Sequence, residues 1–281
     1  PLGAQPAALG LTVPRIAREE GRRLFGSDPA AYDSARPGHA ERVYEVLVER
    51  CGLTRGASVV EVGPGTGQAT RRLLDLGADR VVAIEPDPAL AAYLDRSCGG
   101  RVDVRIVALE DADLPAARFD LAVAASSFHW VEEANGLAKI FAAIRPGGWI
   151  ALWWTLFGEG GEPDAFMQSV DPLLVDLHAS PTHGEEGRPP HALDSAARIA
   201  GLSAAGFEDA SHELVSWRTS WDTQRIRALY GTFSPIARLD DEHRTEILDQ
   251  IARIAEGEFA GRVERAILTS LFTARRPGPL H

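Results

Sequence analysis

The amino-acid sequence predicts an α/β protein built on a doubly wound parallel sheet. Between residues 39 and 155, strand-length apolar runs alternate with amphipathic segments of helical period. The runs are rich in β-branched residues and show little polar alternation, as expected for parallel strands buried on both faces. The segments between them are long enough to hold the helix that connects parallel neighbours. Such an alternation favours a doubly wound sheet.

Five strands and four helices follow from the apolar spacing. The first helix is expected over residues 39–51, where apolar side chains recur at helical intervals on one face. The segment Arg-Pro-Gly-Gly at 145–148 is expected to end the last helix of this part as a turn. The expected strands are 58–62, 80–84, 102–108, 119–125 and 149–155, and the helices between them are 67–76, 88–97 and 132–144.

The pattern changes after residue 155. Residues 156–193 cluster Gly, Pro and Glu around one apolar helical stretch, 166–177, which is typical of a lid or a binding loop. The chain then continues with an expected helix over 195–205, a strand over 213–217, a helix over 241–255 and a final strand over 266–274.

Composition excludes several classes of function. The 281 residues include 40 acidic and 29 basic side chains, a formal net charge of −11. Such a chain is poorly suited to coat a nucleic acid or an anionic membrane surface. The longest apolar run, 149–157, is far shorter than the roughly 20 residues of a membrane helix, and the first residues show no signal-peptide pattern. We expect a cytoplasmic protein that acts on a small molecule.

A glycine-rich turn follows the first strand, in the segment Val59-Val-Glu-Val-Gly-Pro-Gly-Thr-Gly67. Glycines let the backbone turn tightly and let a ligand approach the start of the next helix. Gln68 stands where the dinucleotide fingerprint has its last glycine, which that fingerprint needs for close helix packing around a pyrophosphate. The turn therefore favours a ligand that lacks a pyrophosphate.

Carboxylates after the next two strands complete a candidate adenosine site. Glu85 ends the second strand, where a carboxylate can accept hydrogen bonds from the two hydroxyls of a ribose. Pro86 is expected against one face of the adenine. Glu110 or Asp111, after the third strand, can accept from the adenine amino group, and the spacing leaves both open. Glu85 suits a nicotinamide dinucleotide as well as S-adenosylmethionine (SAM), and a solvated carboxylate is the alternative for each acid.

Together these segments resemble class I SAM-dependent methyltransferases. Four pieces match in order and spacing: 59–67, 83–87, 119–125 and 144–150. Tyr32-x-x-x-Arg36-Pro37 and Phe128-His-Trp130 narrow the resemblance to the methyltransferase type 11 branch that includes trans-aconitate methyltransferase. The resemblance is good over residues 30–155. It implies a Rossmann-like seven-stranded sheet, with the last strand antiparallel beside the fifth and a helical lid inserted after strand five.

Composition, pattern and this resemblance together predict four parts of the chain. These are a flexible N-terminal segment (1–30), a SAM-binding core (31–155), a lid that binds the acceptor (156–205) and a C-terminal part that completes the sheet (206–281). Where the branch usually has R-P-x-Y-P, this chain has Arg-Pro-Gly-His-Ala from Arg36 to Ala40. The implied cofactor contacts are Tyr32 and Arg36 over the methionine carboxylate, Glu61, Gly63 and Gly65 along the methionine, Thr66 and Gly67 at the helix start, Glu85 and Pro86 at the ribose and adenine, Glu110 or Asp111 at the adenine, and Ala125 and Ser126 at the amino group.

His129 is the candidate catalytic residue. An imidazole titrates near neutrality and could act as a base or hold the acceptor, while a packing histidine beside Trp130 is the alternative. We expect His129→Ala to keep SAM affinity and to lower turnover. Trp130 and Trp154 are candidate walls of an acceptor pocket. His178, His183 and His191 fit no compact zinc pattern, so no metal is expected.

The leading hypothesis is methyl transfer from SAM to a small molecule, with oxygen of a hydroxyl or carboxylate as the acceptor atom and S-adenosylhomocysteine (SAH) as the product. A nicotinamide-dependent oxidoreductase is the first alternative, although Gln68 and the Pro-Gly-Gly segment at 146–148 argue against it. A non-catalytic SAM-binding regulator is the second. Neither the acceptor nor the oligomeric state follows from the sequence.

Overall fold

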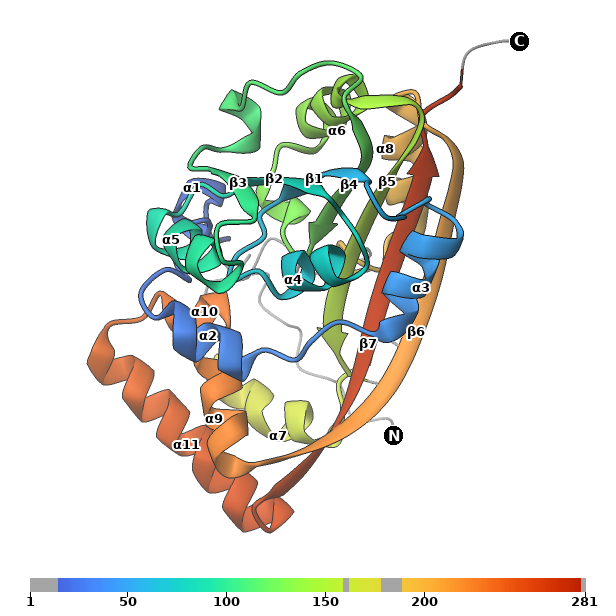
Figure 1. Cartoon of the computed structure of the whole chain (residues 1–281). Helices are drawn as coiled ribbons and strands as arrows, with labels where there is room; N and C mark the ends of the chain where they lie inside the picture. Colours follow the sequence, from blue (N-terminus) through green and yellow to red (C-terminus); the bar gives the residue numbers. More distant parts are fainter. Residues whose placement is uncertain (1–14, 159–161, 178–188, 279–281) are drawn as a thin grey trace, which may run out of the picture.

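The computed structural model describes residues 15–158, 162–177 and 189–278 (Figure 1). Within them lies a seven-stranded sheet of order β3-β2-β1-β4-β5-β7-β6. The first five strands run parallel, and β7 lies antiparallel between β5 and β6. The predicted fold class is therefore confirmed, including the antiparallel last strand beside the fifth. The strands are β1 (Ser58–Val62), β2 (Arg80–Ile84), β3 (Val102–Arg105), β4 (Phe119–Ala125), β5 (Ile144–Phe157), β6 (Glu208–Asp222) and β7 (Arg262–Arg275).

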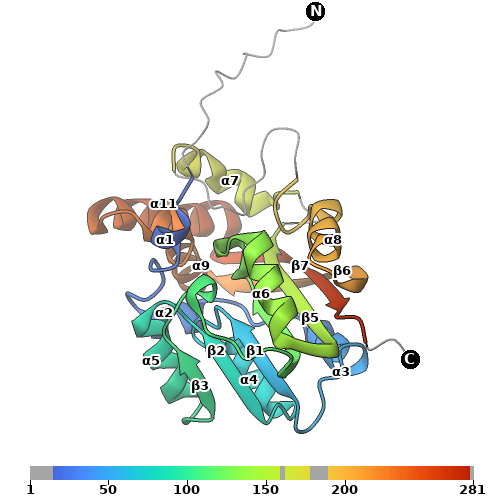
Figure 2. The same cartoon turned by 90° about the horizontal axis from the view of Figure 1, so that it is seen from above.

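Five helices cover the two faces of this sheet. They are α3 (Glu41–Glu49), α4 (Gln68–Asp75), α5 (Pro88–Ser97), α6 (Glu133–Ala143) and α8 (Ser195–Ala204). Leu47 of α3, Leu73 of α4 and Leu94 of α5 are buried in one core cluster with strand residues such as Val59. On the other face, α6 and α8 lie side by side (Figure 2). The strands are thus buried on both sides, which explains their continuous apolar runs.

Four further helices form a separate layer, here called the cap. They are α7 (Ala165–Leu174), α9 (Thr223–Gly231), α10 (Ser234–Ala237) and α11 (Asp241–Phe259). The long strands β6 and β7 run past the parallel strands toward α7, α9 and α11 (Figure 1). Phe166 of α7, Tyr230 of α9 and Ile251 of α11 are buried together in the core of the cap. The cap is therefore assembled from two parts of the chain that are separated by α8 and β6.

The lid expected over 156–205 is divided by the structure. Its first helix, α7, belongs to the cap, but α8 packs on the sheet, where Leu202 joins the core cluster that contains Leu137 and Phe207. The helices α9, α10 and α11, which complete the cap, come from the part that the sequence assigns to the sheet. Amphipathic spacing marks these helices, but it does not show which neighbour each apolar face meets.

Strand boundaries show where local pattern fails. The turn expected at 145–148 is an irregular segment inside β5 (Ile144–Phe157), where the pairing with β4 passes from Ile144 to Trp149 and Gly147 has a φ of 80°. Gly147 N donates to Arg276 O (2.9 Å), and Arg276 N donates to Gly148 O (2.8 Å), so the chain after β7 fixes this segment. Strands β6 and β7 are likewise longer than predicted, because each supplies the other's hydrogen bonds over almost its whole length.

The described N-terminal residues lie against the carboxyl ends of the strands. They include α1 (Arg18–Gly21) and α2 (Pro29–Ala35), and residues 15–27 are called the strap below. A Cβ on Gly21 would lie 1.9 Å from the indole of Trp130, so only glycine allows this close approach. Where a flexible segment is expected over 1–30, Ile16 and Gly21 are buried and most of residues 15–30 are exposed, and residues 1–14 lie outside the described part. In the described ranges, no helix is long and apolar enough to cross a membrane.

Candidate functional site

A cavity opens at the carboxyl ends of β1, β2, β4 and β5. Ten of the sixteen predicted site residues line it: Tyr32, Arg36, Gly63, Gly65, Thr66, Glu85, Pro86, Ala125, Ser126 and Trp130.

The glycine turn forms one wall because its backbone adopts conformations that other residues rarely take. Gly63, Gly65 and Gly67 have φ angles of 62°, 59° and 87°. A Cβ on Gly63 would lie 2.5 Å from Cβ of Ser127, whereas one on Gly65 would meet nothing within 4 Å. Gly67 is the N-cap of α4 and does not itself line the cavity. The turn thus presents its backbone to the cavity and places the start of α4 behind it.

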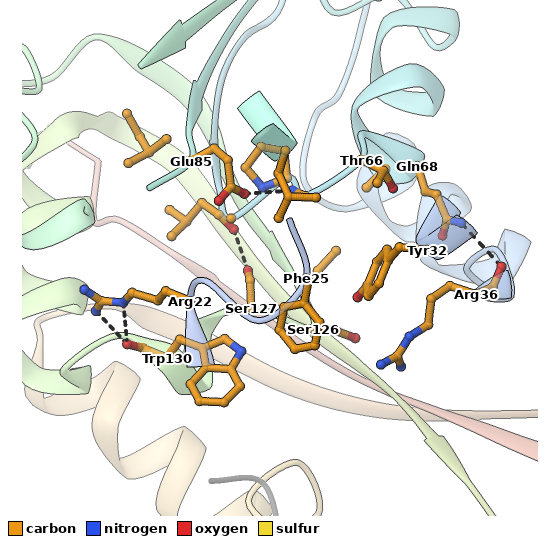
Figure 3. Close-up of a pocket in the computed structure, with 18 of the residues that line it drawn as sticks. Arg22, Phe25, Tyr32, Arg36, Thr66, Gln68, Glu85, Ser126, Ser127 and Trp130 are labelled. Carbon is orange, nitrogen blue, oxygen red and sulfur yellow. Dashed lines mark hydrogen bonds between the residues drawn. The ribbon is translucent and has the colours of Figure 1, made fainter. Parts of the chain in front are cut away.

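Glu85 is the carboxylate in the cavity wall (Figure 3). One carboxylate oxygen accepts from Gly65 N (3.0 Å) and the other from Asp87 N (3.0 Å), which fixes its direction. The side chain is only 3% exposed, and burial raises its pKa to about 7. A carboxylate has about four acceptor positions, so Glu85 retains capacity for two hydroxyl donors.

Tyr32, Arg36 and Ser126 gather at the neighbouring end of the cavity (Figure 3). The guanidinium of Arg36 lies 5.2 Å from the ring centroid of Tyr32 and 5.1 Å from that of Phe233. It donates to Thr232 O (2.8 Å), and its Nε is buried without a partner among the described residues. Ser126 holds a φ of 51°, an uncommon value for a non-glycine residue. This end offers hydrogen-bond donors and one cation.

Glu61 lies behind the cavity wall. It is fully buried, and one of its carboxylate oxygens accepts from Thr70 Oγ1 (2.7 Å). The other oxygen, Oε1, has no partner among the described residues. Burial raises the pKa of Glu61 to about 7. The expected contact along a ligand is therefore indirect at most in this arrangement, because Glu61 is absent from the cavity lining.

The carboxylates expected at an adenine are placed elsewhere. Neither Glu110 nor Asp111 lines the cavity, whose wall here is made by Ala108 and Leu109. Both acids lie on the short helix η1 (Leu109–Asp111). The Glu110 carboxylate accepts from the guanidinium of Arg22 and from Glu132 N. Its pairing with the strap is a long-range contact, which the order of acids in the loop could not reveal.

His129 is a structural neighbour of the cavity in this geometry, because it is absent from the lining. It lies on η2 (Phe128–Trp130), and its Nδ1 accepts from Trp154 Nε1 (3.1 Å). Burial lowers the pKa of His129 to about 3. Trp154 is buried in the core cluster on the α6 and α8 face, whereas Trp130 lines the cavity.

The strap supplies cavity residues that no sequence pattern indicated. Arg22 donates from Nη2 to Trp130 O (2.6 Å), and Phe25 packs between Tyr32 and Trp130, with ring centroids 5.4 and 6.4 Å away (Figure 3). Their positions depend on contacts between residues about 100 apart in the chain, so local spacing carried no signal. The strap closes one side of the cavity.

His39, Thr155 and Phe157 also line the cavity and were not predicted. Thr155 and Phe157 alternate with Trp154 along β5, so strand period alone could have placed them on the face opposite Trp154. His39 occupies the tyrosine position of the R-P-x-Y-P pattern. This departure from the pattern was the one sequence signal that could have marked His39 as a site residue. Gln68 donates from Nε2 to Asp33 O (2.9 Å) and so ties α4 to α2.

Metal binding has no support among the residues described here. No group of three or more His, Cys, Asp or Glu side chains is arranged to hold an ion in residues 15–158, 162–177 and 189–278. His178 and His183 lie outside the described residues. His191 contacts Arg198, with Nη1 of the arginine 2.7 Å from Nε2 of the imidazole.

Comparison with known proteins finds similarity to methyltransferases. Residues 59–148 match the family model described as a methyltransferase domain. An uncharacterized methyltransferase of Schizosaccharomyces pombe is 23% identical over 90% of this chain and 97% of its own. Trans-aconitate 2-methyltransferase of Mycobacterium tuberculosis is 34% identical over 44% of this chain and 47% of its own. The chain thus spans nearly all of the first relative and about half of the second.

Solved structures share the fold. The cyclase SpnF superposes with a TM-score of 0.59 at 20% identity, over 95% of this chain and all of that one. Phosphoethanolamine N-methyltransferase 2 of Haemonchus contortus, solved with phosphomonomethylethanolamine and SAH, gives a TM-score of 0.56 at 14% identity over 93% of this chain and 60% of that one. Together, these matches show that residues 59–148 are similar to a methyltransferase domain and that the chain shares the fold of these solved structures.

Proposed function

We propose that the protein transfers the methyl group of SAM to an oxygen atom of a small molecule bound in the same cavity. The observation that carries this proposal is the cavity itself, which joins the glycine turn and Glu85 at one end to β5 residues at the other. The strap lines one side of the cavity with Arg22 and Phe25, which suits a small acceptor rather than a polymer. SAM supplies a methyl group bound to a sulfonium, which a nucleophile displaces in line.

The residues divide the cavity into a cofactor end and an acceptor end. Glu85 accepts hydrogen bonds from the ribose hydroxyls, and Pro86, Ala108 and Leu109 enclose the adenine. Arg36 and Tyr32 hold the methionine carboxylate, since the guanidinium is already fixed by Thr232 O and two aromatic rings. The unpartnered carboxylate oxygen of Glu61 supports a charged or hydrogen-bonding group nearby.

The charge of the lining favours oxygen over nitrogen as the acceptor atom. Among the described lining residues, Glu85 is the one carboxylate, and it lies at the ribose end, while Arg22 and Arg36 are cations. An ammonium acceptor would find no counter-charge near β5, where Thr155, Phe157 and His39 are neutral. A hydroxyl or a carboxylate fits these surroundings better. The acceptor end thus supports O-methylation.

Titration calorimetry with SAH, with NAD in parallel, tests the cofactor. Binding of SAH alone is expected, and binding of NAD alone would instead support the oxidoreductase. A panel of phenols, alcohols, carboxylic acids and amines, each incubated with SAM while SAH release is measured, then tests the acceptor. Turnover with oxygen acceptors is expected. SAH binding without turnover on any acceptor would favour the non-catalytic regulator.

A further inference from the structure

We propose that His39 is the residue that holds a hydroxyl group of the acceptor and takes its proton during methyl transfer. This inference rests on the proposed function and narrows its acceptor to a hydroxyl compound. It reassigns the role expected for His129 to a histidine that lines the cavity.

The order of the strands places His39 at the acceptor end. Glu85 marks the ribose at β2, and the methionine is expected beside the turn after β1 and the end of β4. Strand β5 comes next in the sheet. The ring of His39 packs edge-on against Trp153 of β5, with centroids 5.5 Å apart. A ligand group that reaches His39 therefore lies beyond the methionine, on the side away from the adenosine.

Two residues that line the cavity, His39 and Thr155, have buried polar atoms without a partner among the described residues. The Nδ1 of His39 is enclosed and forms no hydrogen bond with any described residue. Thr155 Oγ1, on the same wall of the cavity, is also buried without a partner. Thr269 lies opposite Thr155 in the β5–β7 pairing, and its hydroxyl is unpartnered as well. Buried polar groups are rarely left without hydrogen bonds, so this set indicates a place for a polar ligand group.

The electrostatics suit a neutral hydroxyl. Burial lowers the pKa of His39 to about 4, so its imidazole is uncharged near pH 7. A neutral imidazole has one nitrogen that accepts a hydrogen bond. A hydroxyl group can donate to that nitrogen and accept from Thr155 Oγ1 or from a cavity water. A carboxylate acceptor would find no cationic partner beside the neutral His39, and it needs no base for methyl transfer.

In this structure His129 is not placed to hold the acceptor hydroxyl or to take its proton. Its Nδ1 is already used by Trp154 Nε1 (3.1 Å), and its ring is absent from the cavity lining. Of the two histidines, only His39 combines a place in the cavity wall with a ring that no described side chain holds by a hydrogen bond.

The proposed step balances in atoms and charge. The hydroxyl oxygen of the acceptor forms a bond to the methyl carbon as the carbon–sulfur bond breaks, and the electron pair of that bond stays on sulfur. The hydroxyl proton passes to the accepting nitrogen of His39. The imidazolium then releases the proton to water, so one proton appears in solution for each methyl ether formed.

Chemical modification tests the placement without an identified acceptor. Diethyl pyrocarbonate acylates accessible neutral imidazoles, and peptide mass mapping reports each histidine separately. With the full chain saturated by SAH, we expect His39 to react at nearly the rate seen without SAH, and His129 to react at least about tenfold more slowly. Protection of His39 by SAH would place it at the methionine end and overturn the proposal. Equal, slow reaction of both histidines would also overturn it.

Turnover separates this proposal from the proposed function. On a phenol or alcohol that the wild type methylates, His39→Gln is expected to lower kcat about 100-fold or more, as for loss of a general base, while SAH affinity stays within about twofold. The matched variant is Thr155→Val, which should raise KM more than it lowers kcat. Unchanged kcat in His39→Gln would remove His39 from the reaction, whereas a wild type inactive on every oxygen acceptor would remove the proposed function itself.

Discussion

The two ends of the cavity are built in different ways. Most of the proposed cofactor end comes from short segments directly after β1, β2, β3 and β4, joined by Tyr32 and Arg36. Several of these segments carry their own signal, such as the three glycines with positive φ or Glu85 at a strand end. The acceptor end combines His39, the outer half of β5 and the strap, which are far apart in the chain. The comparison indicates that the cofactor end is encoded largely in local sequence, while the acceptor end depends on tertiary contacts.

The cap and the parallel half of the sheet also differ in the interactions that hold them together. The parallel half is held by apolar clusters on both faces of the sheet. The cap adds a fully buried arginine, Arg265, whose Nε donates to Asp164 Oδ2 (2.8 Å) and whose guanidinium lies 5.0 Å from the ring of Phe157. Since Phe157 lines the cavity, this ion pair supports the acceptor end from behind.

The largest expected effect is loss of this ion pair. Asp164→Ala leaves a buried guanidinium without its carboxylate, which costs about 3–5 kcal/mol of the free energy of unfolding. Asp240→Ala is the matched control, because Asp240 also caps a helix, accepting from His243 N (3.0 Å), but lies exposed. Urea unfolding of both variants measures the difference. Similar losses in the two would show that Asp164 acts only as a helix cap.

The cofactor end is tested by Glu85→Ala. Removing a carboxylate that accepts two ribose hydroxyls should weaken SAH binding about 100-fold, since each hydrogen bond to a charged group contributes about 1.5–3 kcal/mol. Titration calorimetry measures the dissociation constant. Glu110→Ala is the informative control, because the structure pairs Glu110 with Arg22. If Glu110→Ala weakened SAH binding as much as Glu85→Ala does, the result would support the adenine contact that the sequence predicts for Glu110.

His129→Ala sharpens the comparison between the two histidines. It leaves the buried Trp154 Nε1 without an acceptor, so we expect a loss of about 2 kcal/mol in unfolding free energy and unchanged SAH affinity. Burial lowers the pKa of His129 from 6.5 to about 3. The unfolded imidazole therefore binds a proton below pH 6.5 while the native one does not, and stability falls as the pH drops toward 3. The variant should show a shallower fall in acid.

SAH affinity should depend on pH through Glu85. Burial raises the pKa of Glu85 to about 7 in the free chain, and the ribose hydroxyls need the carboxylate form. Below pH 7 the acid must lose its proton on binding, so the dissociation constant rises by up to about tenfold per pH unit and is flat well above pH 7. Because the pKa of Glu61 is also raised to about 7, Glu61→Gln is the control. The pH dependence of the SAH dissociation constant should remain in Glu61→Gln and disappear in Glu85→Gln.

The smallest expected effect concerns the strap. Arg22→Ala removes the bonds to Glu110 and to Trp130 O, and we expect SAH to dissociate about fivefold faster, as for loss of about 1 kcal/mol of a partly exposed ion pair. Arg23→Ala is the control, because Arg23 is exposed in the same segment. Stopped-flow displacement of SAH measures both rates. Equal rates in the two variants would mean that the strap does not retain the cofactor.

Sequence alone determined the layout of the sheet and the cofactor end. Apolar runs place β1, β2 and β4 correctly because strands buried on both faces need continuous apolar residues. The glycine turn and Glu85 are recognisable because backbone conformation and strand position are local properties. Most residues predicted in these segments do line the cavity, and Gly67 and Glu61 lie just behind it.

Only the tertiary structure decided the acceptor end. The Glu110 carboxylate accepts hydrogen bonds from Arg22 and from Glu132 N, and His129 accepts one from Trp154. His39 lies in the cavity wall. Each of these positions depends on a partner at least 22 residues away or on a neighbouring strand. The cap joins α7 to α9 and α11 because their apolar faces complete one core. Local spacing shows that a side chain is polar or that a helix face is apolar. The partner of each is fixed only when distant segments pack together.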